Sequence, residues 1–109
     1  MLKEALASAG HEVFLAANGK EGLRLHHDSP ADLIITDLFM PDQEGLETIV
    51  TLVREFPGTS IIAISGNFEA SSMLVVARQL GAADVLQKPF FPDELLAVVE
   101  RVLQLKKAA

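Results

Sequence analysis

The apolar positions of the chain fall into two alternating patterns, one typical of buried strands and one typical of amphipathic helices. Short, almost wholly apolar runs predict strands, and apolar residues spaced three or four apart predict helices. The predicted strands cover residues 12–16, 33–36, 60–64 and 83–86. The predicted helices cover residues 2–9 and 19–27, the stripes within 46–53 and 73–80, and residues 92–107.

Turn signals separate these segments, with Gly10 and Gly81 placed to end the first and fourth helices. Strands that alternate with helices through short loops indicate βα units, in which a parallel sheet is covered by helices on both faces. We therefore expect an α/β fold, a three-layer sandwich with four strands and five helices, and a single domain over residues 1–109.

Composition narrows the classes of function. The chain has 109 residues, no cysteine, 9 Lys+Arg against 15 Asp+Glu, and a formal net charge of −6. Without cysteine there is no disulfide framework, thiolate zinc site or cysteine nucleophile, and an acidic chain without a basic cluster argues against direct nucleic-acid binding. No apolar run approaches the ~20 residues needed to cross a membrane. We expect a cytoplasmic protein.

Three polar residues stand where three predicted strands end: Asp37, Ser65 and Lys88. The carboxyl ends of parallel strands lie at one edge of a sheet, so we expect these side chains to converge where open α/β sheets bind ligands. A carboxylate can attack a phosphoryl group, a hydroxyl can bond the transferred oxygens, and an ammonium can neutralise the added charge. The three residue types are compatible with phosphoryl chemistry, which their spacing alone does not establish.

Around these residues the sequence resembles the receiver domain of two-component response regulators, which has the flavodoxin-like fold. The resemblance runs from the first helix to the last. The matching motifs are Ile34-Ile35-Thr36-Asp37-Leu38-Phe39-Met40-Pro41 with Gly45, Ile61-Ile62-Ala63-Ile64-Ser65-Gly66, and Gly81-Ala82-Ala83-Asp84 through Leu86-Gln87-Lys88-Pro89-Phe90.

The resemblance implies a role for each matched position. Asp37 would be the phosphoacceptor, Ser65 the switch hydroxyl, and Lys88 the lysine that contacts the phosphoryl oxygens, with a cis bond between Lys88 and Pro89. The family's Mg²⁺ would be bound by Asp37 and by the backbone carbonyl of Phe39. The implied donor is a histidine kinase or phosphotransfer protein, and the domain assists its own phosphotransfer and dephosphorylation without being an enzyme in the usual sense.

The chain departs from the family pattern at its amino end. The family opens with a strand that ends in an acidic pair, which binds the metal, whereas this sequence begins within the first helix. Mg²⁺ needs hard oxygen ligands, so we expect weak or absent metal binding and impaired phosphorylation of Asp37. In the strand order 2-1-3-4-5 the absent strand lies between residues 12–16 and 33–36. Either these two segments pair directly or another chain fills the gap, so we expect self-association.

A second departure is Val85, which stands where the family usually has an aromatic residue whose rotamer reports phosphorylation. The alternative function is therefore a pseudo-receiver that is not phosphorylated and acts as a protein–protein interaction or dimerisation module. The segment from Met73 to Ala77 is apolar nearly all round. This segment is either a partner surface or is covered by a neighbouring loop.

The adjacent His26 and His27 raise the question of a metal site. Neighbouring residues on a helix do not face each other, which argues against a shared metal ion. We expect both imidazoles at a solvated helix end.

Overall fold

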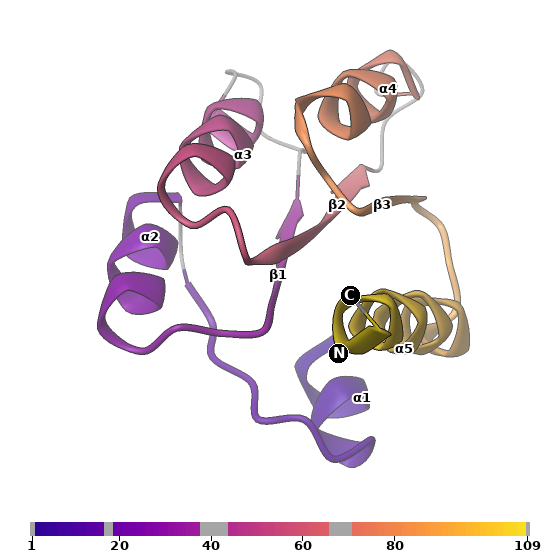
Figure 1. Cartoon of the computed structure of the whole chain (residues 1–109). Helices are drawn as coiled ribbons and strands as arrows, with labels where there is room; N and C mark the ends of the chain where they lie inside the picture. Colours follow the sequence, from indigo (N-terminus) through magenta and orange to yellow (C-terminus); the bar gives the residue numbers. More distant parts are fainter. Residues whose placement is uncertain (1, 17–18, 38–43, 66–70, 109) are drawn as a thin grey trace.

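The computed structural model shows a parallel sheet at the centre of the molecule (Figure 1). The structure describes residues 2–16, 19–37, 44–65 and 71–108. In these ranges the strands are β1 (Leu33–Asp37), β2 (Ser60–Ser65) and β3 (Asp84–Gln87). They lie in the order β1-β2-β3, with both pairs parallel, as the apolar runs predict.

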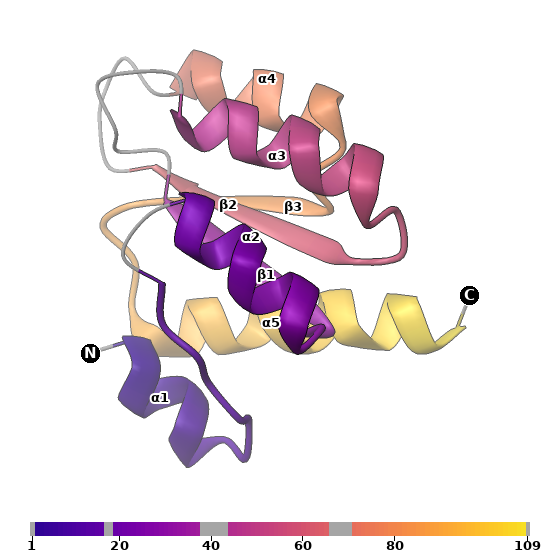
Figure 2. The ribbon, with the colours of Figure 1, turned by 90° about the vertical axis from the view of Figure 1, so that its left-hand side faces the viewer.

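Helices cover both faces of the sheet, which gives the expected three layers (Figure 2). The helices are α1 (Leu2–Ser8), α2 (Gly19–Asp28), α3 (Glu44–Glu55), α4 (Ser71–Leu80) and α5 (Pro92–Ala108). The helices α2, α3 and α4 lie on one face, and α1 and α5 on the other. None of the helices in the described ranges combines the length and apolar character that crossing a membrane requires.

Two apolar clusters fix these layers to the sheet. The cluster under α3 and α4 includes Ile49, Leu52 and Ala77, and the cluster under α1 and α5 includes Leu95 and Val99. The side chains of β2 alternate between the two clusters, and its residues Ile61 to Ser65 are at most 1% exposed. The central strand is therefore the most deeply buried part of the fold.

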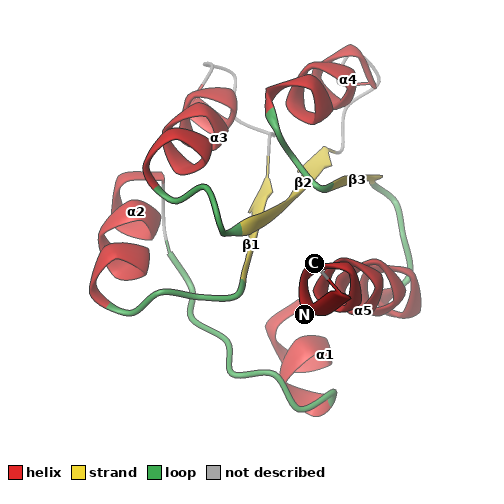
Figure 3. Ribbon diagram, viewed as in Figure 1, coloured by secondary structure: helices red, strands yellow, loops and turns green. Residues whose placement is uncertain are grey.

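The prediction of a strand over residues 12–16 is wrong. These residues form an extended loop between α1 and α2 on the side of β1 away from β2 (Figure 3). The described residues therefore form three strands rather than four, and residues 12–16 do not pair directly with β1. An apolar run becomes a strand only where a neighbouring strand completes its backbone hydrogen bonds, and no such neighbour adjoins residues 12–16 in the described ranges.

The two glycine stop signals are confirmed. Helix α1 ends at Ser8 and α4 at Leu80, and Gly10 and Gly81 follow them with φ angles of 94° and 122°. Residues that carry a Cβ atom rarely adopt such positive φ angles. A Cβ atom at Gly81 would also lie 2.8 Å from Cγ2 of Val53, so glycine here both ends α4 and lets it approach α3.

The expectation that His26 lies at a solvated helix end is wrong. His26 is only 4% exposed. Its Nδ1 accepts a hydrogen bond from the backbone N–H of Ala31 at 3.0 Å, and its Nε2 lies 2.8 Å from the Thr59 hydroxyl. Its ring also packs edge-on against Phe56, with 4.6 Å between ring centroids. His27, by contrast, has a side chain that is 79% exposed.

A buried carboxylate joins β3 to two helices. Asp84 begins β3, and its Oδ1 accepts hydrogen bonds from Arg78 of α4 at 3.0 Å and from the backbone N–H of Val85 at 2.8 Å. Its Oδ2 accepts a hydrogen bond from Arg101 of α5. Burial acts to raise the pKa of Asp84, but the hydrogen bonds from Val85 and Arg101 and the charges of both arginines outweigh it and lower the pKa.

Candidate functional site

The three polar residues at the strand ends lie along the carboxyl edge of the sheet. Asp37 is the last residue of β1 and pairs with Ile64 of β2, and Ser65, the last residue of β2, pairs with Gln87 of β3. Lys88 directly follows β3. The parallel register therefore brings Ser65 and Lys88, which are 28 and 51 positions beyond Asp37 in the sequence, to the same edge as Asp37.

The side chains of Asp37 and Lys88 meet at this edge. The Nζ of Lys88 donates a hydrogen bond to Oδ2 of Asp37 at 2.8 Å. The side chain of Lys88 is 42% exposed and that of Asp37 is 47% exposed. An ion pair this exposed contributes only about 0.2–1 kcal/mol to stability. The pair is thus accessible to a reactant from solvent while adding little to the fold.

Ser65, the last residue of β2, is fully buried, at 0% exposure. Its backbone carbonyl accepts a hydrogen bond from the N–H of Lys88 at 2.8 Å, and the Lys88–Pro89 bond that follows is cis, as the resemblance implies. Among the residues that the structure describes, none offers a hydrogen-bond partner to the Ser65 hydroxyl. A buried hydroxyl without a partner costs roughly 1–3 kcal/mol, and such a cost in a native fold is typical of functional positions.

The metal ligands expected from the resemblance are only partly placed. Asp37 lies at the sheet edge, and Phe39 lies outside the described residues. Within the described ranges no three His, Asp or Glu side chains gather where they could hold a metal ion. The carboxylate of Asp37 already faces the ammonium of Lys88, and Mg²⁺ is usually bound through one or two carboxylates with water and substrate oxygens. The described side chains by themselves do not make a fitted Mg²⁺ site.

One contact at the site depends on the register between β2 and β3 and could not be predicted from the sequence. The bond from the Lys88 N–H to the Ser65 carbonyl joins two of the candidate site residues through the backbone. The sequence shows only that each residue follows an apolar run, and not which backbone atoms face each other. No residue pattern signals this bond before the strand register is known.

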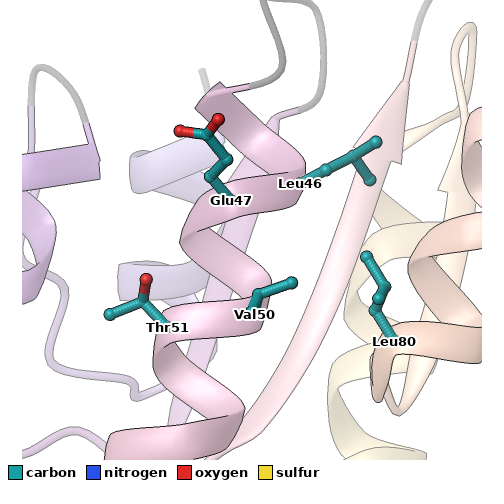
Figure 4. A pocket seen from close by; sticks show the side chains of 5 residues that line it. All are labelled: Leu46, Glu47, Val50, Thr51 and Leu80. Carbon is teal, nitrogen blue, oxygen red and sulfur yellow. The ribbon is translucent and has the colours of Figure 1, made fainter.

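A second surface lies between the helices α3 and α4. A shallow groove of about 480 Å³ runs between α3 and α4, lined by Leu46, Glu47, Val50, Thr51 and Leu80. Leu46 and Val50 point from α3 toward Leu80 of α4, whereas Glu47 and Thr51 point to the other side of α3 (Figure 4). The floor of the groove is therefore apolar.

Comparisons with known proteins agree on one family. The model of the response regulator receiver domain matches residues 1–100. The chain is 30% identical to the chemotaxis protein CheY of Thermotoga maritima over 103 residues, which are 94% of this chain and 85% of that protein. It is 41% identical to the DNA-binding transcriptional regulator NtrC of Azospirillum brasilense over 94% of its own length, but spans only 21% of that larger protein.

Solved structures show the same likeness. The receiver domain of NtrX from Brucella abortus superposes with a TM-score of 0.88 at 28% identity, covering 94% of this chain and 87% of that one. A CheY-like receiver domain protein from Methanospirillum hungatei has a TM-score of 0.86 at 29% identity, covering 98% of this chain and 85% of that one.

Proposed function

The chain belongs to the response regulator receiver domain family, and from this premise we propose that it acts in two-component signalling by accepting a phosphoryl group on Asp37. Receiver domains are phosphoacceptors that interact with histidine kinases or phosphotransfer proteins, and they generally bind Mg²⁺. The observation that carries the proposal is the pair of Asp37 and Lys88, 2.8 Å apart at the carboxyl edge of the sheet.

The proposed reaction is a transfer from a phosphohistidine. A carboxylate oxygen of Asp37 attacks the phosphorus, a new P–O bond forms, and the P–N bond to the donor imidazole breaks. The electron pair of that P–N bond stays with the imidazole, which takes up a proton on leaving. The product on this chain is an acyl phosphate, which water later hydrolyses to restore the carboxylate.

Lys88 and Ser65 have distinct roles in this proposal. The ammonium of Lys88, already in contact with Asp37, neutralises charge on the phosphoryl oxygens as it develops. The Ser65 hydroxyl, buried and without a partner among the described residues, donates a hydrogen bond to a phosphoryl oxygen. The backbone bond between Lys88 and Ser65 couples the two responses.

We further propose that phosphorylation of this chain is slow and incomplete. The described part of the chain gathers no group of carboxylates around Asp37 that could hold Mg²⁺, so Lys88 is the cation that supports the transfer. Removing the metal with a chelator should therefore change the rate of phosphorylation little.

Intact-mass spectrometry after incubation with acetyl phosphate tests the phosphoacceptor proposal. We expect a minor species heavier by one phosphate in the unaltered chain and no such species in Asp37→Asn. Asp28→Asn is a matched control, because its side chain is 71% exposed and it lies in α2, outside the site. Lys88→Gln should lower the phosphorylated fraction at least tenfold with little change in thermal stability. An equal adduct in Asp37→Asn would rule out the proposed site.

A second candidate function, an interaction or dimerisation module without phosphotransfer, is favoured by the exposed apolar surface of α3 and α4. Val75 and Val76 of α4 are 58% and 40% exposed, and Val50 of α3 is 41% exposed. Of the two alternatives for the segment from Met73 to Ala77, cover by a neighbouring loop is therefore wrong at Val75 and Val76. Sedimentation of the unaltered chain and of Val75→Ser tests this function: a dimer that the substitution dissociates would support it, and a monomer at high concentration would exclude self-association through this surface.

A further inference from the structure

The hydroxyl of Ser65 has a polar residue opposite it in the sheet. Ser65 pairs with Gln87 of β3 in the parallel register. The ladder between β1 and β2 ends one pair earlier, at Asp37 and Ile64, so within the described ranges Gln87 is the residue directly opposite Ser65. Adjacent strands lie about 4.8 Å apart, and a glutamine side chain is long enough to span that separation.

The side chains of Ser65 and Gln87 belong to the same face of the sheet. Successive residues of a strand point to opposite faces. On β2, Ile61 and Ala63 pack in the cluster under α3 and α4, and Ser65 follows at the same spacing of two. On β3, Val85 packs against that cluster, and Gln87 follows it at the same spacing. The hydroxyl and the carboxamide therefore start from neighbouring positions on one face.

The two groups complement each other as hydrogen-bonding partners. Ser65 is 0% exposed and its hydroxyl has no partner among the described residues, whereas Gln87 is exposed. A hydroxyl donates one hydrogen bond and accepts two, and the amide nitrogen of glutamine donates two. When the Ser65 proton bonds a phosphoryl oxygen, the Ser65 oxygen can still accept a bond from Gln87. Successive bonds in such a chain polarise and strengthen one another.

We propose that Gln87 is a positioning residue for the phosphorylated state, in which its side-chain amide donates a hydrogen bond to Oγ of Ser65 and orients the Ser65 proton toward the phosphoryl group on Asp37. The exposed side chain of Gln87 folds over Ser65 when the phosphoryl group arrives. The aliphatic Val85, two positions earlier on the same face, cannot supply this bond. The role of Gln87 rests on the proposed function and adds to it a residue that does not touch the reacting atoms.

The rate of phosphorylation by acetyl phosphate, followed by intact mass, tests this role. Gln87→Met keeps the length of the side chain and removes its N–H groups, and we expect it to lower the maximal rate by about threefold or more. The acetyl phosphate concentration at half the maximal rate should stay unchanged, because Gln87 does not touch the donor. Gln104→Met is the matched control, since Gln104 is exposed and lies 12 positions beyond Pro92, about 18 Å along α5.

A double-mutant cycle tests whether Gln87 acts through Ser65. In Ser65→Ala the hydroxyl that Gln87 positions is absent, so adding Gln87→Met should lower the rate further by no more than about 1.5-fold. Gln87→Val repeats the comparison with a strand-forming side chain. Thermal denaturation of every variant identifies those that are folded.

Two outcomes would overturn the role of Gln87 alone. The first is an unchanged rate in both Gln87→Met and Gln87→Val. The second is an equal loss from Gln87→Met with and without the Ser65 hydroxyl, because Gln87 would then act independently of Ser65. A missing phosphate adduct in the unaltered chain would overturn the proposed function and this role with it, and the unaltered chain shows that result before any variant is compared.

Discussion

The imidazole of His26 joins three parts of the chain: α2, the turn into β1 and the start of β2. Because Nδ1 accepts a hydrogen bond from the Ala31 N–H, the proton of the neutral ring lies on Nε2, which donates it to the Thr59 hydroxyl. Both ring nitrogens are thus used, and the ring also packs against Phe56. A protonated ring would place a second N–H against that of Ala31.

We predict that His26→Ala lowers the free energy of unfolding by about 2–4 kcal/mol, because it removes a buried ring together with its hydrogen bonds to the Ala31 N–H and the Thr59 hydroxyl. His27→Ala, one position away and exposed, should change it by less than about 0.5 kcal/mol. Urea denaturation of the two variants measures both values. Equal effects at the two positions would contradict the structural role of His26.

At the residue scale, the sequence predicts the place of the candidate site well and its contacts less well. Asp37 and Lys88 can be identified because each follows an apolar run, and parallel strands end together. The burial of His26 could not be predicted, because its partners Thr59 and Ala31 lie outside its helix. The helical spacing of apolar residues gives information only on the helix itself, and not on what packs against it. The hydrogen bond between Lys88 and Ser65 could not be predicted for the same reason, because it joins two segments that are far apart in the sequence.

Among the elements, β3 depends on one carboxylate for its attachment to α4 and α5. The side chain of Asp84 is 12% exposed, while the side chains of its partners Arg78 and Arg101 are 56% and 60% exposed. The arginines can remain hydrated when Asp84 is neutral, so the cost of losing the charge is smaller than for a fully buried ion pair. The lowered pKa of Asp84 nevertheless makes this attachment dependent on pH.

We predict that Asp84→Asn lowers the free energy of unfolding by about 1–3 kcal/mol at pH 7, and that this difference shrinks in acid. A folded-state pKa below the unfolded value of about 3.9 means that the charged form stabilises the fold above that value. The stabilisation is lost as the pH falls through the lower, folded-state pKa. Denaturation of both proteins between pH 7 and pH 3 measures the difference, and a difference independent of pH would contradict the ion-pair account.

The helices and the paired strands could be predicted from local pattern, but the segment over residues 12–16 could not. All five helices and the strands β1, β2 and β3 lie where apolar spacing and glycine stop signals predict them. Residues 12–16 have the same strand-forming composition as the others. A strand also needs a neighbour, which is a property of the whole sheet rather than of the segment.

The whole molecule presents two different surfaces, the carboxyl edge of the sheet and the groove between α3 and α4. The carboxyl edge presents Asp37 and Lys88 to solvent, whereas the groove between α3 and α4 presents apolar side chains. The candidate phosphoacceptor site is built from the carboxyl ends of β1, β2 and β3, so it exists only in the folded chain. Chemistry at Asp37 therefore reports on the assembly of the sheet.

The most direct test of the account is to locate the phosphoryl group after incubation with acetyl phosphate. Borohydride reduces an aspartyl phosphate to homoserine, which peptide sequencing by mass spectrometry then identifies. We predict homoserine at position 37 in a minor fraction of the chains, and none at position 37 in Lys88→Gln within the same incubation time. Homoserine at another aspartate, or none anywhere after prolonged incubation, would contradict the assignment of Asp37 as the phosphoacceptor.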